Sequence, residues 1–396
     1  MKLLVYSHFF APSVGGVETI VLSLARGLAE LRKPGGDPEF EVSLATQTPA
    51  DIFDDGSLPF RVVRRPTLIQ LWDLIRASDA VHFAGPSLAP LFLTFLARKP
   101  AVVEHHGYQA ICPNGLLLHR PDEAVCPGHF LGRNYLECVR CLRQECSAFR
   151  SWRRLLMMFP RHFFARCATA NVAISDHAMR RCALPRSSVV YHGIEDPLEG
   201  RRPIDAASLS DGKICFAYVG RLVSEKGIPV LLEASRLLSE EGHSFEVRLI
   251  GDGPERSNVE AIIARDRLES CVRITGFLTG ASFAETLRDV CVVVMPSVWE
   301  ETAGLAAIEQ MMRGRLVIAS DIGGLGEVLD GTGVKCPPGD PAALARAMRD
   351  VLRQPTLIDS LGKTARERAL QLFVRGRMIA EHAQLYRKVV QDLENR

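Results

Sequence analysis

Residues 289–310 read DVCVVVMPSVWEETAGLAAIEQ. The stretch begins with a run of apolar, mostly β-branched residues, which is typical of a buried strand, and it ends in a helical pattern. Gly304 separates the two parts, so Glu301 lies on the loop after the strand and Glu309 lies in the helix. A strand that passes through a glycine loop into a helix is the repeating unit of an α/β protein.

The same unit recurs through most of the chain. Nearly continuous apolar runs, which predict parallel strands buried on both faces, occur at residues 2–6, 40–46, 79–84, 101–106, 171–175, 188–192, 213–219, 245–250, 291–296 and 315–320. The polar segment 195–212 contains two prolines and lacks periodicity, so we interpret it as an interdomain linker. This order predicts an α/β fold with two doubly wound parallel sheets. Ligands of such sheets bind beyond the carboxyl ends of the strands, here in the cleft between the domains.

The composition narrows the class of protein. The chain has 396 residues, of which 47% are hydrophobic, and a formal net charge of +2 from 48 basic and 46 acidic residues. This length predicts two domains, and the balanced charge argues against a nucleic-acid partner. The eleven cysteines are scattered and follow no secretory signal, which favours a reducing cytosol. The apolar stretch 88–97 is interrupted by Pro90 and is too short to cross a bilayer. We therefore expect a cytoplasmic protein, soluble or peripheral at the inner face of the membrane.

Three strand-to-helix junctions are suited to a diphosphate. Gly15 and Gly16 follow the first strand and precede a helix, whose bare amides can approach an anion. Arg221 and Lys226 follow the strand at 213–219 and again precede a helix. Gly304 leads into a third helix start. The alternatives are an ordinary Gly-Gly turn at the first junction and a solvated basic turn at the second.

Six segments together resemble a known family. They are GGVE (15–18), VGRLVSEKG (219–227), GDGPE (251–255), ITGFL (274–278), PSVWEETAGLAAIE (296–309) and SDIGGLGEVL (320–329). In this order they resemble the motif series of the family-4 retaining glycosyltransferases, whose Glu-x7-Glu pair matches Glu301 and Glu309. The resemblance covers nearly the whole chain. It implies the GT-B fold, with two Rossmann-like domains that face a central cleft.

The resemblance also implies the organisation and the reaction. Residues 1–194 would form the acceptor-side domain, residues 213–372 the nucleotide-sugar domain, and residues 373–396 a helix that packs back toward the first domain. The enzyme would move a sugar from a UDP- or GDP-sugar to a glycan or lipid-linked acceptor, with retention and without a metal cofactor for catalysis. Polysaccharide or glycolipid assembly is the setting that the family implies. The alternatives are a nucleotide-sugar epimerase of the same fold and a non-catalytic, zinc-dependent adaptor.

The family pattern implies roles for individual residues. Glu301 would contact hydroxyls of the transferred sugar, Glu309 would bind the ribose, and Arg221 and Lys226 would neutralise the diphosphate. The further implied contacts are the amides of Gly15, Gly16, Gly304 and Leu305 to phosphate, the backbone at 273–278 around Gly276 to the base, and His106 to the donor sugar. His105 should point the opposite way along the strand, and we expect it to be packed. The chain departs from the family at residues 301–304, 323–327 and 192–195, but no departure removes a charged catalytic group.

Residues 112–146 hold five of the eleven cysteines. Cys138 and Cys141 form a CxxC, and Cys112 and Cys126 lie upstream, each followed by a proline. These four thiolates could hold a structural zinc in a folded insertion, with Cys146 as a bystander. Related transferases carry a similar insertion, which supports a folded segment but does not identify a metal. The alternative is a loop of reduced, unliganded thiols.

Residues 149–167 mix five arginines with one tryptophan and four phenylalanines. A basic amphipathic helix with aromatic residues can lie on an anionic bilayer. We favour a helix that packs its apolar side into the first domain and is broken at Pro160, with membrane contact as the alternative.

Overall fold

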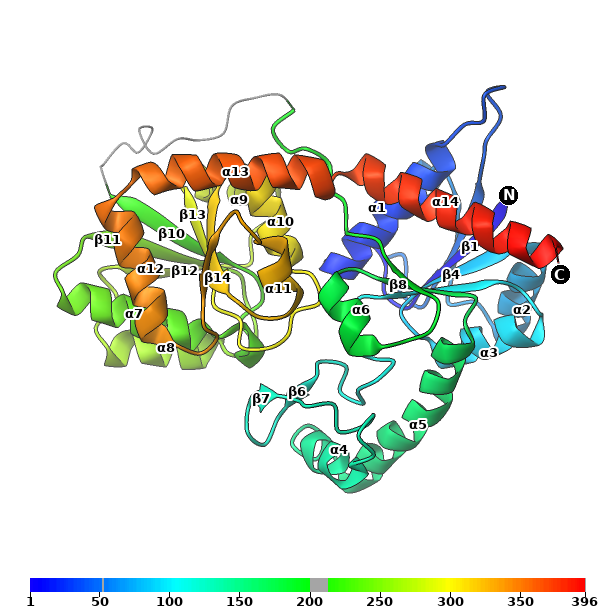
Figure 1. Cartoon of the computed structure of the whole chain (residues 1–396), viewed down its shortest axis with the longest axis horizontal. Coiled ribbons are helices and arrows are strands. Elements are labelled where there is room, and N and C mark those ends of the chain that lie inside the picture. Colours follow the sequence, from blue (N-terminus) through cyan, green and yellow to red (C-terminus); the bar gives the residue numbers. More distant parts are fainter. Residues whose placement is uncertain (52, 200–212, 396) are drawn as a thin grey trace. The chain divides into compact units, whose positions relative to one another are not determined.

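The computed structural model describes residues 1–51, 53–199 and 213–395 (Figure 1). The chain forms two compact units. Unit 1 contains Met1–Asp122, Cys126–Glu195 and the C-terminal segment from Phe373, and unit 2 contains Glu123–Val125 and Asp196–Leu372. The main chain thus passes from unit 1 to unit 2 between Glu195 and Asp196. Most of the predicted linker, residues 200–212, lies outside the described residues.

Unit 1 is built on a parallel sheet of seven strands in the order β3-β2-β1-β4-β5-β8-β9. Its strands are β1 (Lys2–Ser7), β2 (Glu41–Thr46), β3 (Arg61–Arg64), β4 (Ala80–Ala84), β5 (Ala101–His105), β8 (Ala170–Ala173) and β9 (Ser187–Val189). Val5 in β1 pairs with Leu44 in β2 on one side and with His82 in β4 on the other. The apolar strand residues are buried because helices cover both faces of such a sheet.

All helices of unit 1 except the last lie between strands in the sequence. They are α1 (Gly16–Glu30), α2 (Leu68–Ala77), α3 (Leu88–Leu96), α4 (Tyr135–Leu142), α5 (Ala148–Cys167), α6 (Asp176–Cys182) and α14 (Arg375–Glu394), with a short 3-10 helix at Asp55–Ser57. The last of them, α14, follows unit 2 in the sequence but packs against α1 and β4 (Figure 1). A small two-stranded sheet, β6 (Leu118–His119) with β7 (Ala124–Val125), lies in the cysteine-rich insertion.

Unit 2 repeats the plan with six parallel strands in the order β12-β11-β10-β13-β14-β15. They are β10 (Ile214–Val219), β11 (Phe245–Ile250), β12 (Val272–Gly276), β13 (Val292–Met295), β14 (Leu316–Ser320) and β15 (Val334–Cys336). Its helices are α7 (Ile228–Glu240), α8 (Arg256–Arg265), α9 (Gly280–Thr286), α10 (Leu305–Met312), α11 (Gly323–Val328), α12 (Pro341–Arg353) and α13 (Thr356–Leu372), with a 3-10 helix at Ser224–Lys226. Asp340 caps α12 by accepting a hydrogen bond from the Ala343 amide at 2.9 Å. The prediction of two doubly wound parallel sheets is confirmed.

Two details of the prediction were wrong. The strands β3, β12 and β15 were missed because they are short or carry charged residues, so no continuous apolar run marks them. Helix α5 is not broken at Pro160 but continues through it to Cys167. Proline removes one backbone hydrogen bond from a helix, and the burial of Leu155, Met158 and Ala165 on both sides of Pro160 offsets that loss. Among the described residues, no helix combines the length and the apolar character needed to cross a bilayer.

Candidate functional site

The candidate site of unit 2 lies where the order of the strands reverses. Strand β10 is the first strand of this unit, and β11 and β13 flank it on opposite sides. The connections that leave β10 and β13 therefore diverge, which opens a crevice at the carboxyl ends of these strands. Arg221 and Lys226 lie on the loop after β10, and Glu301 lies on the loop after β13. The topology thus brings these three predicted residues to the same edge of one sheet.

Lys226 and Glu301 form a nearly buried ion pair. The Lys226 ammonium lies 2.8 Å from Oε1 of Glu301, and the two side chains are 18% and 6% exposed. The Ser297 hydroxyl donates a hydrogen bond to the same oxygen. The ammonium also lies 5.9 Å from the centroid of the Trp299 ring. These contacts fix the direction of the Glu301 carboxylate before any ligand binds.

Two glycines allow the loops around this pair to approach each other. Gly227 has a φ of +66°, and a Cβ there would lie 2.0 Å from the carbonyl oxygen of Pro296. Gly323 has a φ of +63°, and its Cβ would lie 2.5 Å from the carbonyl oxygen of Glu301. The Gly324 amide donates a hydrogen bond of 2.6 Å to that same carbonyl. The GGLG segment (323–326) therefore packs against the backbone of Glu301, and a side chain at Gly323 would displace that backbone.

Helix α10 starts at this site. Gly304 precedes it in a left-handed conformation, with φ 75° and ψ 56°, and Leu305 is its first residue. The first amides of a helix have no acceptor within the helix, so they are available to an anionic ligand. Glu309 lies in the second turn, where burial raises the pKa of its carboxyl and Arg313 acts in the opposite direction.

The remaining predicted residues of unit 2 lie at the ends of neighbouring strands. Arg221 is exposed, and its carbonyl accepts a hydrogen bond of 2.6 Å from the Tyr218 hydroxyl. Gly276 ends β12, and its carbonyl accepts a hydrogen bond of 2.9 Å from the Gly251 amide. The Gly220 amide also donates a hydrogen bond of 3.0 Å to the carbonyl oxygen of Ile250. Together these backbone hydrogen bonds join the segments that follow β10, β11 and β12.

Unit 1 has its own reversal of strand order between β1 and β4. The loop after β1 ends at Gly15, which caps α1 in an extended conformation, and Gly16 is the first helical residue. Both are therefore at the amide end of a helix of 15 residues. The Glu18 carboxylate lies over this turn, since a Cβ on Gly15 would come within 2.4 Å of its Oε2. A phosphate that approaches these amides would move that flexible side chain aside.

Strand β5 of the same sheet ends at His105, one residue earlier than predicted, so His106 opens the following loop. Its Nδ1 lies 3.1 Å from Nε2 of His192, and its Nε2 lies 3.4 Å from Oε2 of Glu104. His105 points to the other face, where its Nε2 lies 2.8 Å from Oδ1 of Asn171. Burial lowers the pKa of His105 to about 4, so it is a neutral, packed histidine, as predicted.

Sequence reasoning missed the residues that support the predicted ones. They are Ser297 beside Glu301 in unit 2, and Glu104, His82, His192 and His382 around His106 in unit 1. Burial acts to raise the pKa of Glu104, but the contacts with His106, His82 and His382 hold that pKa well below its ordinary value. One signal was available: Glu104 is a charged residue in an otherwise apolar strand, two positions before His106 and therefore on its face.

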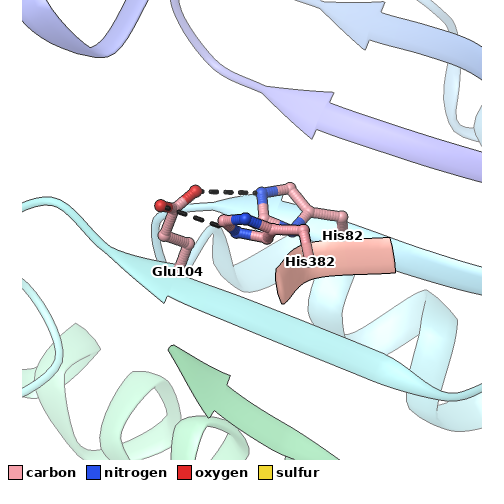
Figure 2. Close-up of side chains that lie close together, drawn as sticks. All are labelled: His82, Glu104 and His382. Atoms are coloured by element: carbon pink, nitrogen blue, oxygen red, sulfur yellow. Dashed lines mark ion pairs between the residues drawn. The ribbon is translucent and has the colours of Figure 1, made fainter. Parts of the chain in front are cut away.

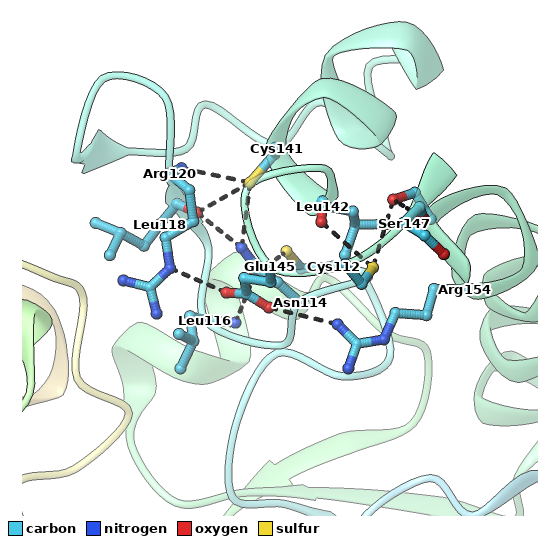
Figure 3. A network of polar contacts seen from close by, with 12 residues as sticks. Cys112, Asn114, Leu116, Leu118, Arg120, Cys141, Leu142, Glu145, Ser147 and Arg154 are labelled. Carbon is cyan, nitrogen blue, oxygen red and sulfur yellow. Dashed lines mark hydrogen bonds and ion pairs between the residues drawn. The ribbon is translucent and has the colours of Figure 1, made fainter. Parts of the chain in front are cut away.

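The cysteine-rich insertion brings its four predicted ligands to one small cavity. Figure 3 shows two of them, Cys112 and Cys141, in the polar network around Asn114. Cys112, Cys126, Cys138 and Cys141 all line it. Sγ of Cys141 lies 3.4 Å from the Arg120 amide and 3.3 Å from the side-chain nitrogen of Asn114. Burial raises the pKa of Cys112 to about 11, and burial together with the neighbouring thiols raises that of Cys138 to about 12. Removing these protons is therefore costly unless a cation binds.

Cys146 lies apart from this cavity, with its Sγ 3.3 Å from the carbonyl oxygen of Leu142 and 3.4 Å from the Ser151 hydroxyl. Within the described residues, three groups of His, Cys, Asp or Glu bring their ligand atoms within 4.8 Å of one another, and none includes a cysteine. They are His82, Glu104 and His382; Glu104, His106 and His192; and His119, His129 and Glu137. The sulfur atoms would have to draw closer together to share a metal ion.

Comparison with known sequences agrees with the reading of unit 2. Residues 213–354 match the family described as glycosyl transferases group 1. A 2-deoxystreptamine glucosyltransferase of Streptomyces kanamyceticus is 34% identical over 162 residues, which is 40% of this chain and 41% of that protein. A glycogen synthase of Mycobacterium tuberculosis is 31% identical over 205 residues, which is 51% of this chain and 49% of that protein. The chain thus spans less than half the length of either relative.

Solved structures show similarity along the whole chain. HepE of Anabaena in complex with UDP has a TM-score of 0.72 at 18% identity, over 98% of this chain and 100% of that one. Sucrose-phosphate synthase of Thermosynechococcus elongatus has a TM-score of 0.72 at 21% identity, over 99% of both chains. At this level of identity the similarity shows the fold alone, and it confirms the GT-B fold.

Proposed function

We propose that this chain is a retaining glycosyltransferase that moves a sugar from a nucleotide-sugar donor to an acceptor hydroxyl. The observation that carries the proposal is the Lys226–Glu301 pair, 2.8 Å apart at the strand reversal of unit 2 and close to the start of α10. A cation, a directed carboxylate and free helix amides are the groups that a sugar diphosphate requires. The family match over residues 213–354 supports the same activity.

Each of these groups has a part in the transfer. The bond between the anomeric carbon and the diphosphate oxygen breaks, and its electron pair leaves with the diphosphate. Lys226, Arg221 and the amides at Gly304 and Leu305 stabilise the charge that grows there, which is usually the largest catalytic contribution. The acceptor hydroxyl adds to the same face of the sugar, and its proton passes to the departing phosphate oxygen. No step requires a metal ion.

The other residues select the donor. Glu301 accepts hydrogen bonds from sugar hydroxyls, and Glu309 accepts them from the ribose, as a carboxylate does in dinucleotide-binding folds. The backbone around Gly276 meets the base. HepE of Anabaena has been solved with UDP-glucose, which makes a UDP-sugar the first donor to test. In unit 1, His106 contacts the sugar, and Gly15 and Gly16 offer amides to the phosphates.

The acceptor is proposed to be a glycan or a lipid-linked sugar. Helices α3 and α5 expose large apolar side chains, namely Phe92, Phe95, Leu96, Phe149, Trp152, Leu156, Met157, Phe159 and Phe163. Arginines are interspersed with them along α5. Packing into unit 1 buries only part of the apolar side of α5. The exposed remainder is suited to an anionic bilayer, from which a lipid-linked acceptor could be taken.

The test is the release of nucleotide from a panel of UDP- and GDP-sugars, with and without candidate acceptors and in the presence of a mild chelator. We expect release that increases with acceptor, survives the chelator and yields a product with the donor's anomeric configuration by NMR. Release that never depends on an acceptor would favour the epimerase. Strict dependence on added Mg²⁺ or Mn²⁺ would contradict the metal-independent mechanism.

We also propose that Cys112, Cys126, Cys138 and Cys141 hold a structural zinc in the insertion. The support is the small cavity that all four buried cysteines line. Spectroscopy should then show sulfur about 2.3 Å from the zinc. Cys138→Ser should release this metal, whereas Cys146→Ser should retain it. If protein prepared under reducing conditions contains no sulfur-bound zinc, the zinc proposal is wrong and the segment is a loop of packed, reduced thiols.

A further inference from the structure

A buried carboxylate in unit 1 is surrounded by imidazoles. Glu104 in β5 is fully buried, and the rings of His82, His106, His192 and His382 all lie within 3.8 Å of one of its oxygens. These histidines come from β4, from the loops after β5 and β9, and from α14. Such a concentration of metal-binding side chains, of which His82, Glu104 and His382 are fully buried, requires a physical reason, because each buried polar group is costly unless it is paired.

His82 and His382 lie next to each other, and each faces one oxygen of the carboxylate (Figure 2). Nε2 of His82 lies 3.3 Å from Oε2 of Glu104, and Nε2 of His382 lies 3.8 Å from Oε1. Within the described part of the chain, none of these four atoms has a partner with hydrogen-bond geometry. Around a tetrahedral metal ion with bonds of 2.0–2.1 Å, neighbouring ligand atoms lie about 3.4 Å apart. The His82 separation of 3.3 Å matches that of shared metal ligands, and the His382 separation of 3.8 Å is too long for a direct hydrogen bond.

The opposite nitrogens of the two rings are held by other groups. Nδ1 of His382 lies 2.9 Å from the carbonyl oxygen of Met378, and Nδ1 of His82 lies 2.9 Å from the Tyr386 hydroxyl. A carbonyl can only accept, so Nδ1 of His382 donates to it and carries a proton, which leaves Nε2 as the ring nitrogen that faces Glu104. Histidines that bind metals commonly donate their other N–H to such an outer partner.

The second pair of histidines is engaged differently. Nδ1 of His106 and Nε2 of His192 lie 3.1 Å apart, so the hydrogen bond between them occupies the lone pair of one of these nitrogens. His82 and His382 have no such bond to each other, and both of their Nε2 atoms remain directed at Glu104. The donor atoms of these three residues lie within 4.8 Å of one another.

We propose that His82, Glu104 and His382 bind one divalent transition-metal ion of the zinc class, as a structural site that fastens α14 to β4 and β5. Two imidazoles and a carboxylate form a donor set that suits zinc and its neighbours. The site is buried, so the metal enters as the unit folds, and its binding free energy adds to the stability of the fold. The proposal does not depend on the transferase activity, because it concerns a metal that takes no part in the reaction.

The test compares metal content in the full chain after incubation with Zn²⁺ and removal of loosely bound ions. We expect His382→Ala and His82→Ala each to hold about one equivalent less zinc than the wild type, whatever the cysteine insertion contributes. His162→Ala is the matched control. Its Nδ1 also faces a backbone carbonyl, that of Ala110 at 3.1 Å, and it belongs to none of the three ligand groups. This variant should keep the wild-type content, and equal content in all four proteins would overturn the proposal.

A milder variant covers the case in which the alanine variants do not fold. Tyr386→Phe removes only the hydroxyl that contacts His82 and retains the packed ring. Loss of an outer partner typically weakens metal binding by about 10- to 100-fold. Chelator competition should show that loss for one equivalent of metal. With Co²⁺ in place of zinc, the spectrum should show tetrahedral nitrogen and oxygen ligation that His382→Ala abolishes. Unchanged affinity in Tyr386→Phe, or a Co²⁺ spectrum with no such ligation, would refute the site.

Discussion

Replacing Lys226 by methionine separates its effect on catalysis from its effect on folding. Methionine keeps most of the aliphatic stem and removes the charge 2.8 Å from Glu301. Loss of one preorganised charge-stabilising group costs about 10²- to 10³-fold in turnover, or roughly 2.7–4 kcal/mol of transition-state stabilisation. We expect a loss of that size in nucleotide release at saturating donor.

The same change should destabilise the chain. Removing one partner of a fully buried ion pair costs roughly 3–5 kcal/mol, because the other charge remains buried without its counterion. The Lys226 side chain is 18% exposed, so water replaces part of its effect, and we expect about 2–3 kcal/mol from urea unfolding. Adding Glu301→Gln removes the stranded charge and leaves an amide oxygen for the Ser297 hydroxyl. The double variant should regain most of the stability and none of the turnover.

The control is Lys335→Met. Lys335 lies 3.4 Å from carboxylate oxygens of Asp321 and Asp330, which are 55% and 72% exposed, so its loss should cost less than about 1 kcal/mol. Turnover in Lys226→Met within tenfold of the wild type would refute the catalytic role. A double variant no more stable than the single one would refute the account of the buried charge.

Three further outcomes are expected. Because burial raises the pKa of Glu309 and ribose binding needs its ionised form, nucleotide affinity measured by calorimetry should fall as the pH drops toward that pKa, and Glu309→Gln should lack this dependence. Gly323→Ala places a Cβ 2.5 Å from the carbonyl oxygen of Glu301, so it should lose more stability and turnover than Gly331→Ala, which has a similar φ of +73° but open space around it. Trp152→Glu should weaken sedimentation with anionic vesicles, and binding that is equal on neutral vesicles would contradict the membrane contact.

The sequence allowed the fold to be predicted, and it placed the candidate residues of unit 2 after their strands, because both depend on local pattern. Most buried strands leave a continuous apolar run, and the candidate residues Lys226 and Glu301 each follow their strand within a few positions. Parallel topology then brings the loops together without further information. The strands β3, β12 and β15 were not predicted, because each lies at an edge of its sheet and its sequence contains no continuous apolar run.

The cluster around Glu104 could not be predicted in this way. His82 and Tyr386 are 304 positions apart in the sequence and meet only because α14 returns to unit 1 after unit 2 is complete. Nothing in the periodicity of α14 indicates which strand it will cover. A histidine on a helix is usually an ordinary surface or core residue. His382 can therefore be identified as a candidate metal ligand only from its position beside the Glu104 carboxylate.

The two buried glutamates meet the same physical problem in different ways. The Glu301 carboxylate has a direct ionic partner in Lys226, 2.8 Å away, and it also accepts a hydrogen bond from the Ser297 hydroxyl. Glu104 faces four imidazoles, whose ring nitrogens lie 3.3–3.8 Å from its oxygens. A metal ion bound as proposed would lie about 2.0–2.2 Å from a carboxylate oxygen, closer than any of these rings. The lysine pair therefore suits a site that must open to a ligand, whereas the imidazole cluster suits a site that remains closed around a metal ion.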